Sequence, residues 1–300
     1  MRASLLLVLA AALLVAGCSV EQEPTSSRPA TTPAFTPPEF QRAVVVVFEN
    51  HNRSGIAGSV AAPTFRAYAT RFASLPGYRG VAHPSLPNYL ALVSGSTHGI
   101  TGDCTTCTIA AESLADSLDT AGLSWKTYAE DLPSPGFLGA KHRLYGKEHD
   151  PLVYFDSVVT QPDRLQRIVP FARFHDDLAA RALPRFSLVV PNLCHDLHVC
   201  PVATGDAWLK RFLRELFRSP QMRRGVVFVI FDESESYAGG GGGGSVFAFA
   251  AGGAVRPHSV NASSLSHYNV LATLEANWGL PRLGLSSSAQ PITGIWRGGK

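Results

Sequence analysis

The sequence of 300 residues has little charge, few cysteines and methionines, and no apolar run long enough to cross a membrane. Only 16% of the residues are charged and the net charge is +3, which is too small to argue for nucleic acid or a strongly anionic surface as the partner. By contrast, 45% of the residues are apolar, enough for one large domain or two small ones with a well-buried core.

The longest apolar run lies at the N-terminus, from Leu5 to Ala16, and is shorter than a transmembrane helix. A run of this length after a basic start is typical of a secretory signal over residues 1–17. Val15-Ala16-Gly17-Cys18 resembles a bacterial lipobox, which would make a lipidated Cys18 the mature N-terminus. The alternative is an ordinary signal peptide with a coincidental cysteine.

A polar segment follows, and residues 18–39 are rich in Ser, Thr, Pro, Glu and Gln without periodicity. Such a segment cannot bury enough apolar area to order itself, so it predicts a tether. We therefore expect an exported protein, held on the outer side of the cell membrane by a lipid at Cys18 or secreted, with its folded domain at residues 40–300.

Four of the five cysteines form two close couples in the sequence, Cys104/Cys107 and Cys194/Cys200. In an oxidising compartment, pairing within each couple is the simplest assignment, although four cysteines allow three connectivities. A zinc site at Cys104-x-x-Cys107 is the weaker alternative, because two further ligands at suitable spacing are missing.

Apolar strand patterns alternate with helical patterns along the chain. The strongest strand prediction is Arg42 to Phe48, whose four consecutive valines fit a strand buried on both faces of a parallel sheet. Further strands are predicted at Leu123–Tyr128, Phe186–Val190, Val226–Phe231 and Val246–Ala250, and helices near residues 65–72, 110–120, 172–182, 205–218 and 266–277. Another helix is predicted within residues 83–100. The alternation predicts an α/β fold with a mostly parallel central sheet sandwiched by helices.

Three of the apolar strands end directly on polar residues: Glu49-Asn50, the segment from Asn192 to His198, and Asp232-Glu233. Sites in open α/β sheets collect beyond the carboxyl ends of the strands, so we expect these groups to meet. Oxygen ligands such as Glu49, Asn50, Asp232 and Glu233 suit a hard divalent cation.

The segment His83–Ile100 contains the candidate nucleophile, Ser85, between two prolines and before an apolar run. Proline is tolerated in the first turn of a helix, so Ser85 is expected at a helix start, where free N–H groups favour an anion such as phosphate. Asn88 could turn its amide toward the group that Ser85 attacks. A nearby cation would let the serine attack phosphorus as an alkoxide. The alternative is a purely structural role for Ser85, as the Ser-Pro N-cap of a buried helix.

Several histidines are candidates for a leaving-group acid or a metal ligand. They are His98, His149, His195, His198 and His267.

The order of these motifs resembles the metal-dependent phosphoesterases related to the alkaline phosphatase superfamily, and more closely the bacterial acid phosphatase and phospholipase C branch. The resemblance covers about Ala43 to Trp296 and includes Ser85, Asn88, the stretch YAEDLP at residues 128–133, and SHYNVLATLE around His267. It is nearest to the compact secreted acid phosphatases of mycobacteria, which act on phosphoinositides.

This resemblance implies an alkaline-phosphatase-like fold and roles for individual residues. Ser85 would be the phosphorylated nucleophile and Asn88 the residue that steadies the phosphoryl group, with His149, His198 and His267 also in the catalytic set. The implied metal ligands are Glu49, Asn50, Asp196, Asp232 and Glu233.

The sequence thus predicts an exported phosphomonoesterase, active on phosphoinositides among other monoesters, that uses a divalent metal and a phosphoserine intermediate. The alternatives are a phosphodiesterase of the phospholipase C type and, in another class, a non-catalytic binding lipoprotein on the same scaffold. No nucleic-acid partner is expected.

Overall fold

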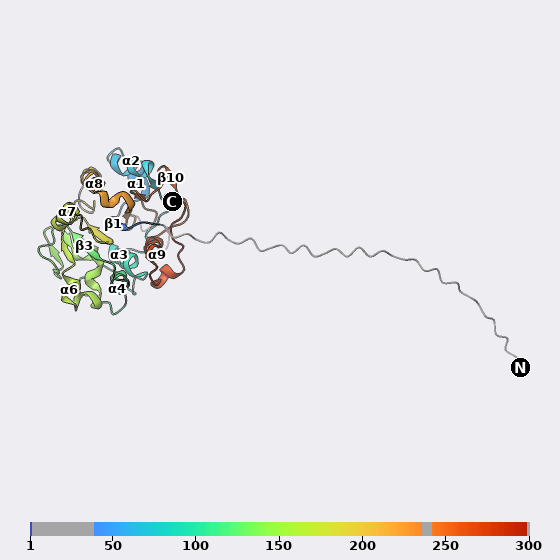
Figure 1. Cartoon of the computed structure of the whole chain (residues 1–300), viewed down its shortest axis with the longest axis horizontal. Coiled ribbons are helices and arrows are strands. Elements are labelled where there is room, and N and C mark those ends of the chain that lie inside the picture. Colours follow the sequence, from blue (N-terminus) through green and yellow to red (C-terminus); the bar gives the residue numbers. More distant parts are fainter. Residues whose placement is uncertain (2–38, 236–241, 299–300) are drawn as a thin grey trace. The chain divides into compact units, whose positions relative to one another are not determined.

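An eight-stranded sheet lies at the centre of the computed structural model, which describes residues 39–235 and 242–298 together with Met1 (Figure 1). The strand order is β10-β2-β9-β8-β1-β7-β3-β6. The strands are β1 (Arg42–Phe48), β2 (Ala73–Ser74), β3 (Trp125–Ala129), β6 (Ile168–Pro170), β7 (Phe186–Val190), β8 (Gly225–Phe231), β9 (Ala248–Ala251) and β10 (Ser259–Val260). A separate hairpin joins β4 (Lys141–His142) and β5 (Tyr145–Gly146).

Strand β1 is central because its valines can be buried on both faces. It pairs in parallel with β7 on one side and β8 on the other, and residues 43–48 are fully enclosed. The parallel pairings β7–β3 and β3–β6 extend the sheet, so the carboxyl ends of five neighbouring strands lie along one edge. We name this edge, beyond the carboxyl ends of β8, β1, β7 and β3, the catalytic edge.

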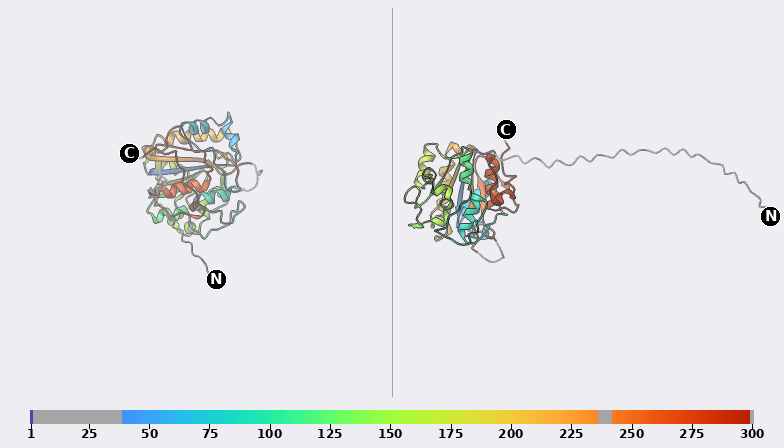
Figure 2. Two further views of the ribbon diagram at one scale, coloured as in Figure 1. Left: turned by 90° about the vertical axis from the view of Figure 1, so that its right-hand side faces the viewer. Right: turned by 90° about the horizontal axis from the view of Figure 1, so that it is seen from below.

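Helices cover both faces of the sheet (Figures 1 and 2). On one face lie α1 (Arg53–Ala57), α2 (Pro63–Arg71), α7 (Ala172–Ala179) and α8 (Val202–Leu216), and on the other α3 (Ser85–Ser94), α4 (Leu114–Thr120), α6 (Pro162–Leu165) and α9 (His267–Trp278). The short helix α5 (Asp156–Val159) and the 3-10 turns at 147–149, 151–154, 220–224 and 284–287 connect these elements. The predicted α/β class with a mostly parallel sheet between helices is confirmed.

The structure corrects some local predictions. Strand β9 is antiparallel to both of its neighbours, β2 and β8, because it follows β8 without a crossover helix between them. Helix α4 begins at Leu114 rather than near residue 110, since Ser113 and Asp116 form a capping box that fixes the helix start.

Both cysteine couples are disulfides, Cys104–Cys107 and Cys194–Cys200, as the simplest assignment predicted. The zinc alternative at the first couple is therefore wrong. The predicted signal peptide after Met1, the predicted lipidation of Cys18 and the predicted tether up to residue 38 lie outside the described residues, as do the first three glycines of the run from Gly239 to Gly244. In the part of the chain that is described, no helix has the length and apolarity to span a membrane.

Candidate active site

The polar ends of β1, β7 and β8 meet as the sequence predicts. The Glu49 N–H donates to the carbonyl oxygen of Asp196 at 2.8 Å, and the Asp232 N–H donates to that of Phe48 at 3.0 Å. The Asn50 N–H donates to Asp232 Oδ1 at 3.1 Å. Glu49, Asp196 and Asp232 are all buried, so the adjacent parallel strands bring three carboxylates together inside the protein.

Ser85 is the first residue of α3, after Pro84, and its hydroxyl donates to Glu49 Oε2 at 2.7 Å. Hydrogen bonding from the same hydroxyl also lowers the pKa values of Asp232 and Glu233, against the larger effect of burial. The candidate nucleophile therefore lies among three carboxylates at the catalytic edge.

The start of α3 is less open to an anion than the sequence indicated. The Leu86 N–H donates to Asp103 Oδ1 at 2.9 Å, and Pro87 has no N–H. A carboxylate of the protein thus already uses part of the positive end of this helix.

Asn88 does not extend its amide toward Ser85. Its oxygen accepts the N–H groups of Val81 and Ala82 at 2.8 and 3.0 Å, and its NH₂ donates to the carbonyls of Ala82 and Pro84 at 2.9 and 3.0 Å. All of these bonds go to the segment that precedes Ser85, and Asn88 is 1% exposed. In this structure Asn88 shapes the loop that delivers the serine.

His149 and His198 lie beside Glu49. The Nε2 atom of His149 is 3.4 Å from Glu49 Oε1 and its Nδ1 atom is 3.2 Å from Asp196 Oδ2. The Nδ1 atom of His198 is 3.5 Å from Glu49 Oε2, and its side chain is 37% exposed. Ligand atoms of Glu49, His149 and His198 all lie within 4.8 Å of one another, a spacing suited to a metal ion.

His267, a predicted member of the catalytic set, lies behind the end of β8. Its Nε2 atom is 2.7 Å from the carbonyl oxygen of Asp232 and its Nδ1 atom is 3.0 Å from the Tyr78 hydroxyl. Burial lowers the pKa of His267 to about 4, so the ring is neutral, donates to Asp232 and accepts from Tyr78. Both nitrogens are used and the residue is 1% exposed, so in this structure His267 supports the end of β8 instead of facing a substrate.

Two other candidate histidines also have structural partners. His98 Nε2 lies 2.8 Å from the hydroxyl of Ser94, at the end of α3. His195 Nδ1 lies 2.7 Å from Glu130 Oε2. Neither of these nitrogens is directed at Ser85.

The electrostatics of the site favour a bound cation. Burial, and then repulsion from Glu49 and Glu233, raises the pKa of Asp232 well above its usual value. Burial also raises the pKa of Asp196, and burial with repulsion from Glu49 and Asp103 raises that of Glu233 to about 8. These carboxylates repel one another without enough positive charge between them.

Glu49 behaves differently, because cationic and donating groups surround it. Burial alone would raise its pKa, but the charge of His149 and hydrogen bonds from His198, Tyr89 and Ser85 lower it to about 2. Burial alone would lower the pKa of His149, but Glu49 and Asp196 raise it to about 9.

Weakly satisfied buried atoms support the same conclusion about a cation. Among the described residues, Asp232 Oδ2, Asp196 Oδ2 and His149 Nε2 are buried without a hydrogen bond, although His149 makes ion-pair contacts with Asp196 and Glu49 at 3.2 and 3.4 Å. Buried polar atoms are normally hydrogen-bonded, so this group of atoms fits the ligands of a divalent metal. The five predicted ligands, Glu49, Asn50, Asp196, Asp232 and Glu233, all lie at the catalytic edge; for Asn50 the hydrogen bond described is that of its backbone.

Sequence reasoning missed three residues of the site. The Tyr89 hydroxyl donates to Glu49 Oε1 at 2.5 Å, and its ring stacks on His149 with centroids 5.2 Å apart. His83 Nδ1 pairs with Glu233 Oε2, and Asp103 caps the start of α3. Tyr89 could have been found, since it follows Ser85 by one helical turn and shares its face. His83 and Asp103 gave no comparable signal.

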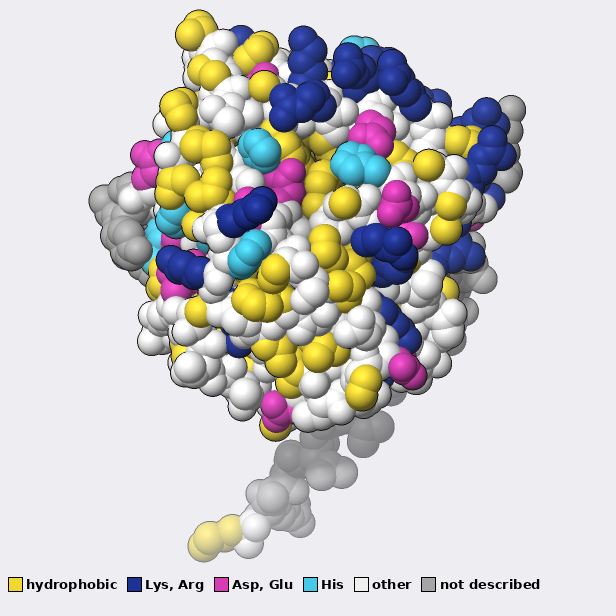
Figure 3. Space-filling view, turned by 90° about the vertical axis from the view of Figure 1, so that its left-hand side faces the viewer, with side chains coloured by type: hydrophobic (Ala, Val, Ile, Leu, Met, Phe, Trp, Pro, Cys, Tyr) yellow, Lys and Arg dark blue, Asp and Glu magenta, His cyan; other side chains and the backbone are white. Residues whose placement is uncertain are grey.

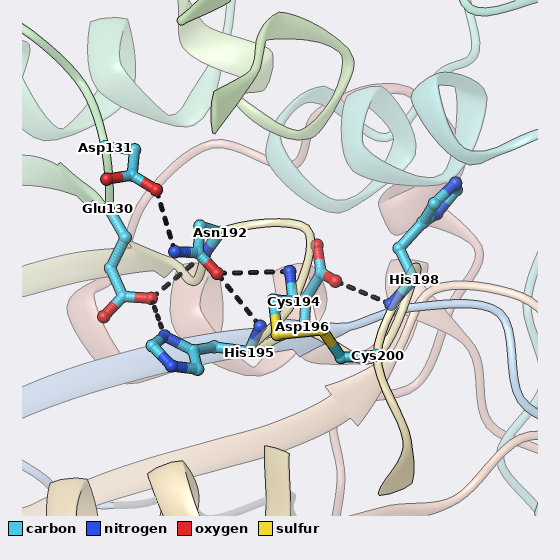
Figure 4. Close-up of a disulfide and its surroundings, with 8 residues drawn as sticks. All are labelled: Glu130, Asp131, Asn192, Cys194, His195, Asp196, His198 and Cys200. Carbon is cyan, nitrogen blue, oxygen red and sulfur yellow. Dashed lines mark hydrogen bonds and ion pairs between the residues drawn. A yellow bond between two sulfur atoms is a disulfide. The ribbon is translucent and has the colours of Figure 1, made fainter. Parts of the chain in front are cut away.

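A second hydrogen-bond network supports the loop with Asp196 and His198 (Figure 4). Glu130, which follows β3, accepts from Asn192 N at 3.1 Å, from His195 Nδ1 at 2.7 Å and from Trp208 Nε1 at 2.8 Å. The Cys194–Cys200 disulfide closes the same loop, and the Asp196 carboxylate accepts the His198 N–H at 2.8 Å. The stretch at residues 128–133, which had no assigned role, thus supplies the anchor of this loop.

Comparison with known proteins agrees with this architecture. A family model described as the Phosphoesterase family matches residues 58–281. The chain is 36% identical to a phosphatidylinositol-3-phosphatase of Mycobacterium tuberculosis, over 86% of this chain and 84% of that protein. It is 34% identical to a phosphate-repressible acid phosphatase of Penicillium chrysogenum over 70% of this chain, but it spans only 53% of that protein's length.

Among solved structures, a protein in the alkaline phosphatase superfamily from Vibrio parahaemolyticus superposes with a TM-score of 0.57 at 12% identity, covering 85% of this chain and 71% of that one. At such low identity the likeness concerns the fold alone. The family match and the mycobacterial relative reach further: the chain belongs to the phosphoesterase family.

Proposed function

We propose that this chain is an exported acid phosphatase that hydrolyses phosphate monoesters with a divalent metal and a phosphoserine intermediate at Ser85. Phosphatases among its relatives support phosphoric monoester hydrolysis as the reaction class. The observation that supports the mechanism best is the Ser85 hydroxyl, 2.7 Å from the buried Glu49 and within the field of Asp232 and Glu233.

The residues that would hold the metal are Glu49, Asn50, Asp196, Asp232 and Glu233, with His149 next to them. A metal bound there would lower the pKa of the serine hydroxyl and neutralise charge on the phosphoryl oxygens.

The chain's own groups orient and protonate the reactants. The hydrogen bond to Glu49 fixes the Ser85 hydroxyl, which gives up its proton to solvent. The serine oxygen then forms the bond to phosphorus while the bond from phosphorus to the leaving alcohol breaks. His198 is the group that we assign to protonating the leaving oxygen, because it is partly exposed and its hydrogen bond to Glu49 raises its pKa. Water then hydrolyses the phosphoserine. Asn88 and His267 act as positioning residues, through the 81–84 segment and the end of β8 respectively.

The substrate that we propose is a phosphate monoester, with phosphoinositides as one class, since a mycobacterial relative is named a phosphatidylinositol-3-phosphatase. The alternative is a phosphodiesterase of the phospholipase C type with the same nucleophile. Parallel assays with p-nitrophenyl phosphate and a p-nitrophenyl phosphodiester separate the two; faster turnover of the diester would favour the alternative.

The nucleophile is tested with Ser85→Ala, and Ser94→Ala in the same helix is the control because its hydroxyl bonds to the backbone and to His98. We expect Ser85→Ala to fold and bind metal while turnover falls by several orders of magnitude, and Ser94→Ala to keep activity. Wild-type protein quenched in acid during turnover of labelled substrate should carry phosphate on the Ser85 peptide. Label on a histidine, or a Ser85→Ala protein of near-normal activity, would overturn the assignment.

Metal dependence needs a separate test. Chelation should abolish activity, and metal analysis of the wild type should find a bound divalent ion. His198→Gln should then retain that metal while losing turnover of poor leaving groups most strongly. Loss of the metal in His198→Gln would make His198 a ligand instead of the acid.

A further inference from the structure

Arginine side chains crowd the edge of the sheet opposite the catalytic edge. We name this region the basic edge and define it by six residues. They are Arg42, Arg181, Arg185, Arg218, Arg223 and Arg224.

The topology explains why these arginines lie together. Arg42 begins β1, Arg185 directly precedes β7 and Arg224 directly precedes β8. Since β7, β1 and β8 are adjacent and parallel, their first residues lie at one edge, and the spacing between neighbouring strands is about 4.8 Å. The other three occupy the connections that lead into β7 and β8.

Backbone contacts confirm that the three strand starts are neighbours. Gln41 N donates to Arg224 O at 2.7 Å and Ala43 N donates to Arg185 O at 2.8 Å. The Arg185 guanidinium donates to the Gln41 carbonyl at 2.9 Å. Arg42 Nε donates to the Leu183 carbonyl at 2.9 Å. These guanidinium groups use backbone oxygens and not carboxylates.

The positive charge of this edge has little compensation. Burial, and then repulsion by Arg185, lowers the pKa of Arg42. In the described part of the chain, these six arginines make one ion pair. It joins Arg224 to Glu39 at 3.8 Å, and both side chains are largely exposed. By comparison, Arg164 and Arg167 both pair with Asp119.

The molecule is therefore polarised along its strands. The carboxylates Glu49, Asp196, Asp232 and Glu233 lie at the catalytic edge, and the six arginines lie at the other. Figure 3 shows Lys and Arg side chains gathered along the top and right of one face, with most His side chains away from its right side. A net charge of +3 hides this separation.

The chain enters the fold at the basic edge, where Phe40 packs against Trp278 and Trp296 with centroids 5.6 and 5.5 Å apart. The sequence predicts a lipid on Cys18, and a coil of the length from there to Glu39 spans roughly 25 Å. An anchor on that segment would keep this edge, rather than the catalytic edge, near the lipid.

We propose that the basic edge docks on an anionic lipid surface, so that the catalytic edge faces away from the membrane that holds the protein. An anionic bilayer attracts clustered arginines within about a Debye length, which is shorter than the tether. Lipid is favoured over nucleic acid because the predicted anchor joins the domain at this edge. Substrate then arrives from solution or from another surface.

The test uses the full chain with vesicles of phosphatidylcholine, prepared with and without phosphatidylglycerol. All vesicles include a dansyl-labelled lipid. Sedimentation measures binding, and energy transfer from tryptophan, including Trp278 and Trp296 beside the basic edge, measures proximity. The test variant combines Arg218→Gln with Arg223→Gln, two exposed side chains without ion pairs among the described residues. The matched control combines Lys141→Gln with Arg143→Gln, in the hairpin that bonds to the loop after β7 through Leu144 O.

We expect phosphatidylglycerol to increase binding and energy transfer in a salt-dependent manner. The arginine pair should weaken this anionic component about thirtyfold, since each basic residue near such a surface contributes about a factor of five. The control pair should change it little, and both variants should hydrolyse soluble substrate normally. A lipid anchor contributes equally to the vesicle binding of all variants.

Three results would overturn the proposal. The first is equal binding to both vesicle types, and the second is an equal effect of the two charge pairs, which would reflect net charge alone. The third is binding to duplex DNA, weakened by the arginine pair, without a response to phosphatidylglycerol. None of these results depends on phosphatase activity, so the proposal fails or stands separately from the proposed function.

Discussion

Glu130→Gln is the most informative perturbation outside the group of residues that surround Ser85. The Glu130 carboxylate accepts three hydrogen bonds, from Asn192 N, His195 Nδ1 and Trp208 Nε1. Two of these donors belong to the loop that carries Asp196 and His198 (Figure 4). Glutamine keeps the shape of the side chain but has one acceptor oxygen, and its NH₂ group must then face a donor.

The magnitude follows from the number and type of bonds. A hydrogen bond to a charged group contributes about 1.5–3 kcal/mol, and the substitution loses at least one and weakens the others. We therefore expect the free energy of unfolding to fall by about 3 kcal/mol. Supporting residues around metal ligands typically change metal affinity or activity by about 10- to 100-fold, so we expect a loss in that range at Glu130→Gln.

Three measurements belong together: chemical unfolding, metal titration of the chelator-treated protein, and kcat with KM for p-nitrophenyl phosphate. Asp131→Asn is the matched control, because Asp131 Oδ2 accepts one bond from Asn192 Nδ2 at 2.9 Å and asparagine can still accept it. Its effects should be below about 1 kcal/mol.

A Glu130→Gln protein that loses stability but keeps wild-type metal affinity and kcat would refute a positioning role for Glu130, since the network would then support the fold alone. An equal effect of Asp131→Asn would refute it as well. Loss of metal affinity with a normal KM at saturating metal would support a positioning role through Asp196.

Three further predictions concern the nucleophile loop, the histidine beside Glu49 and a disulfide. Asn88→Ala removes the acceptor of two backbone N–H groups, so unfolding experiments should show a loss of about 2–4 kcal/mol along with lost activity; unchanged stability would instead favour a direct contact with phosphate. In the chelator-treated protein His149 has a pKa raised to about 9, so its contribution to stability is full below the unfolded value near 6.5 and disappears as the pH rises through 9. Melting temperatures over that window should fall for the wild type and fall less for His149→Gln, in which carboxyls with raised pKa values such as Glu233 still titrate; parallel curves would contradict this. Cys194→Ser with Cys200→Ser should lower kcat more than its stability loss of about 2–3 kcal/mol suggests, and unchanged kcat would show that the bridge does not position Asp196.

The sequence by itself determined the layers of the fold and the place of the site. Runs such as the valines of β1 and the apolar residues of β8 fit strands buried on both faces of a parallel sheet, and the polar residues that follow such strands share one edge. Ser85 at a helix start is also local information, because proline restricts the preceding backbone and is tolerated in the first turn. The disulfides likewise follow from short separations.

Tertiary structure decided what the individual side chains contact. Asn88 and His267 have the residue types and sequence positions expected of catalytic groups, yet Asn88 bonds to the loop before Ser85, and His267 is enclosed between Tyr78 and the backbone of Asp232. The contact of His267 with Tyr78 joins residues 189 positions apart, so no local pattern specifies it. The partners of Asn88 are only four to seven positions away, but its residue type alone does not reveal that the loop folds back onto it. The separation of charge arises in the same way. Arginines distant in the sequence gather at one edge because β1, β7 and β8 begin side by side, and a net charge cannot reveal how its members are arranged in space.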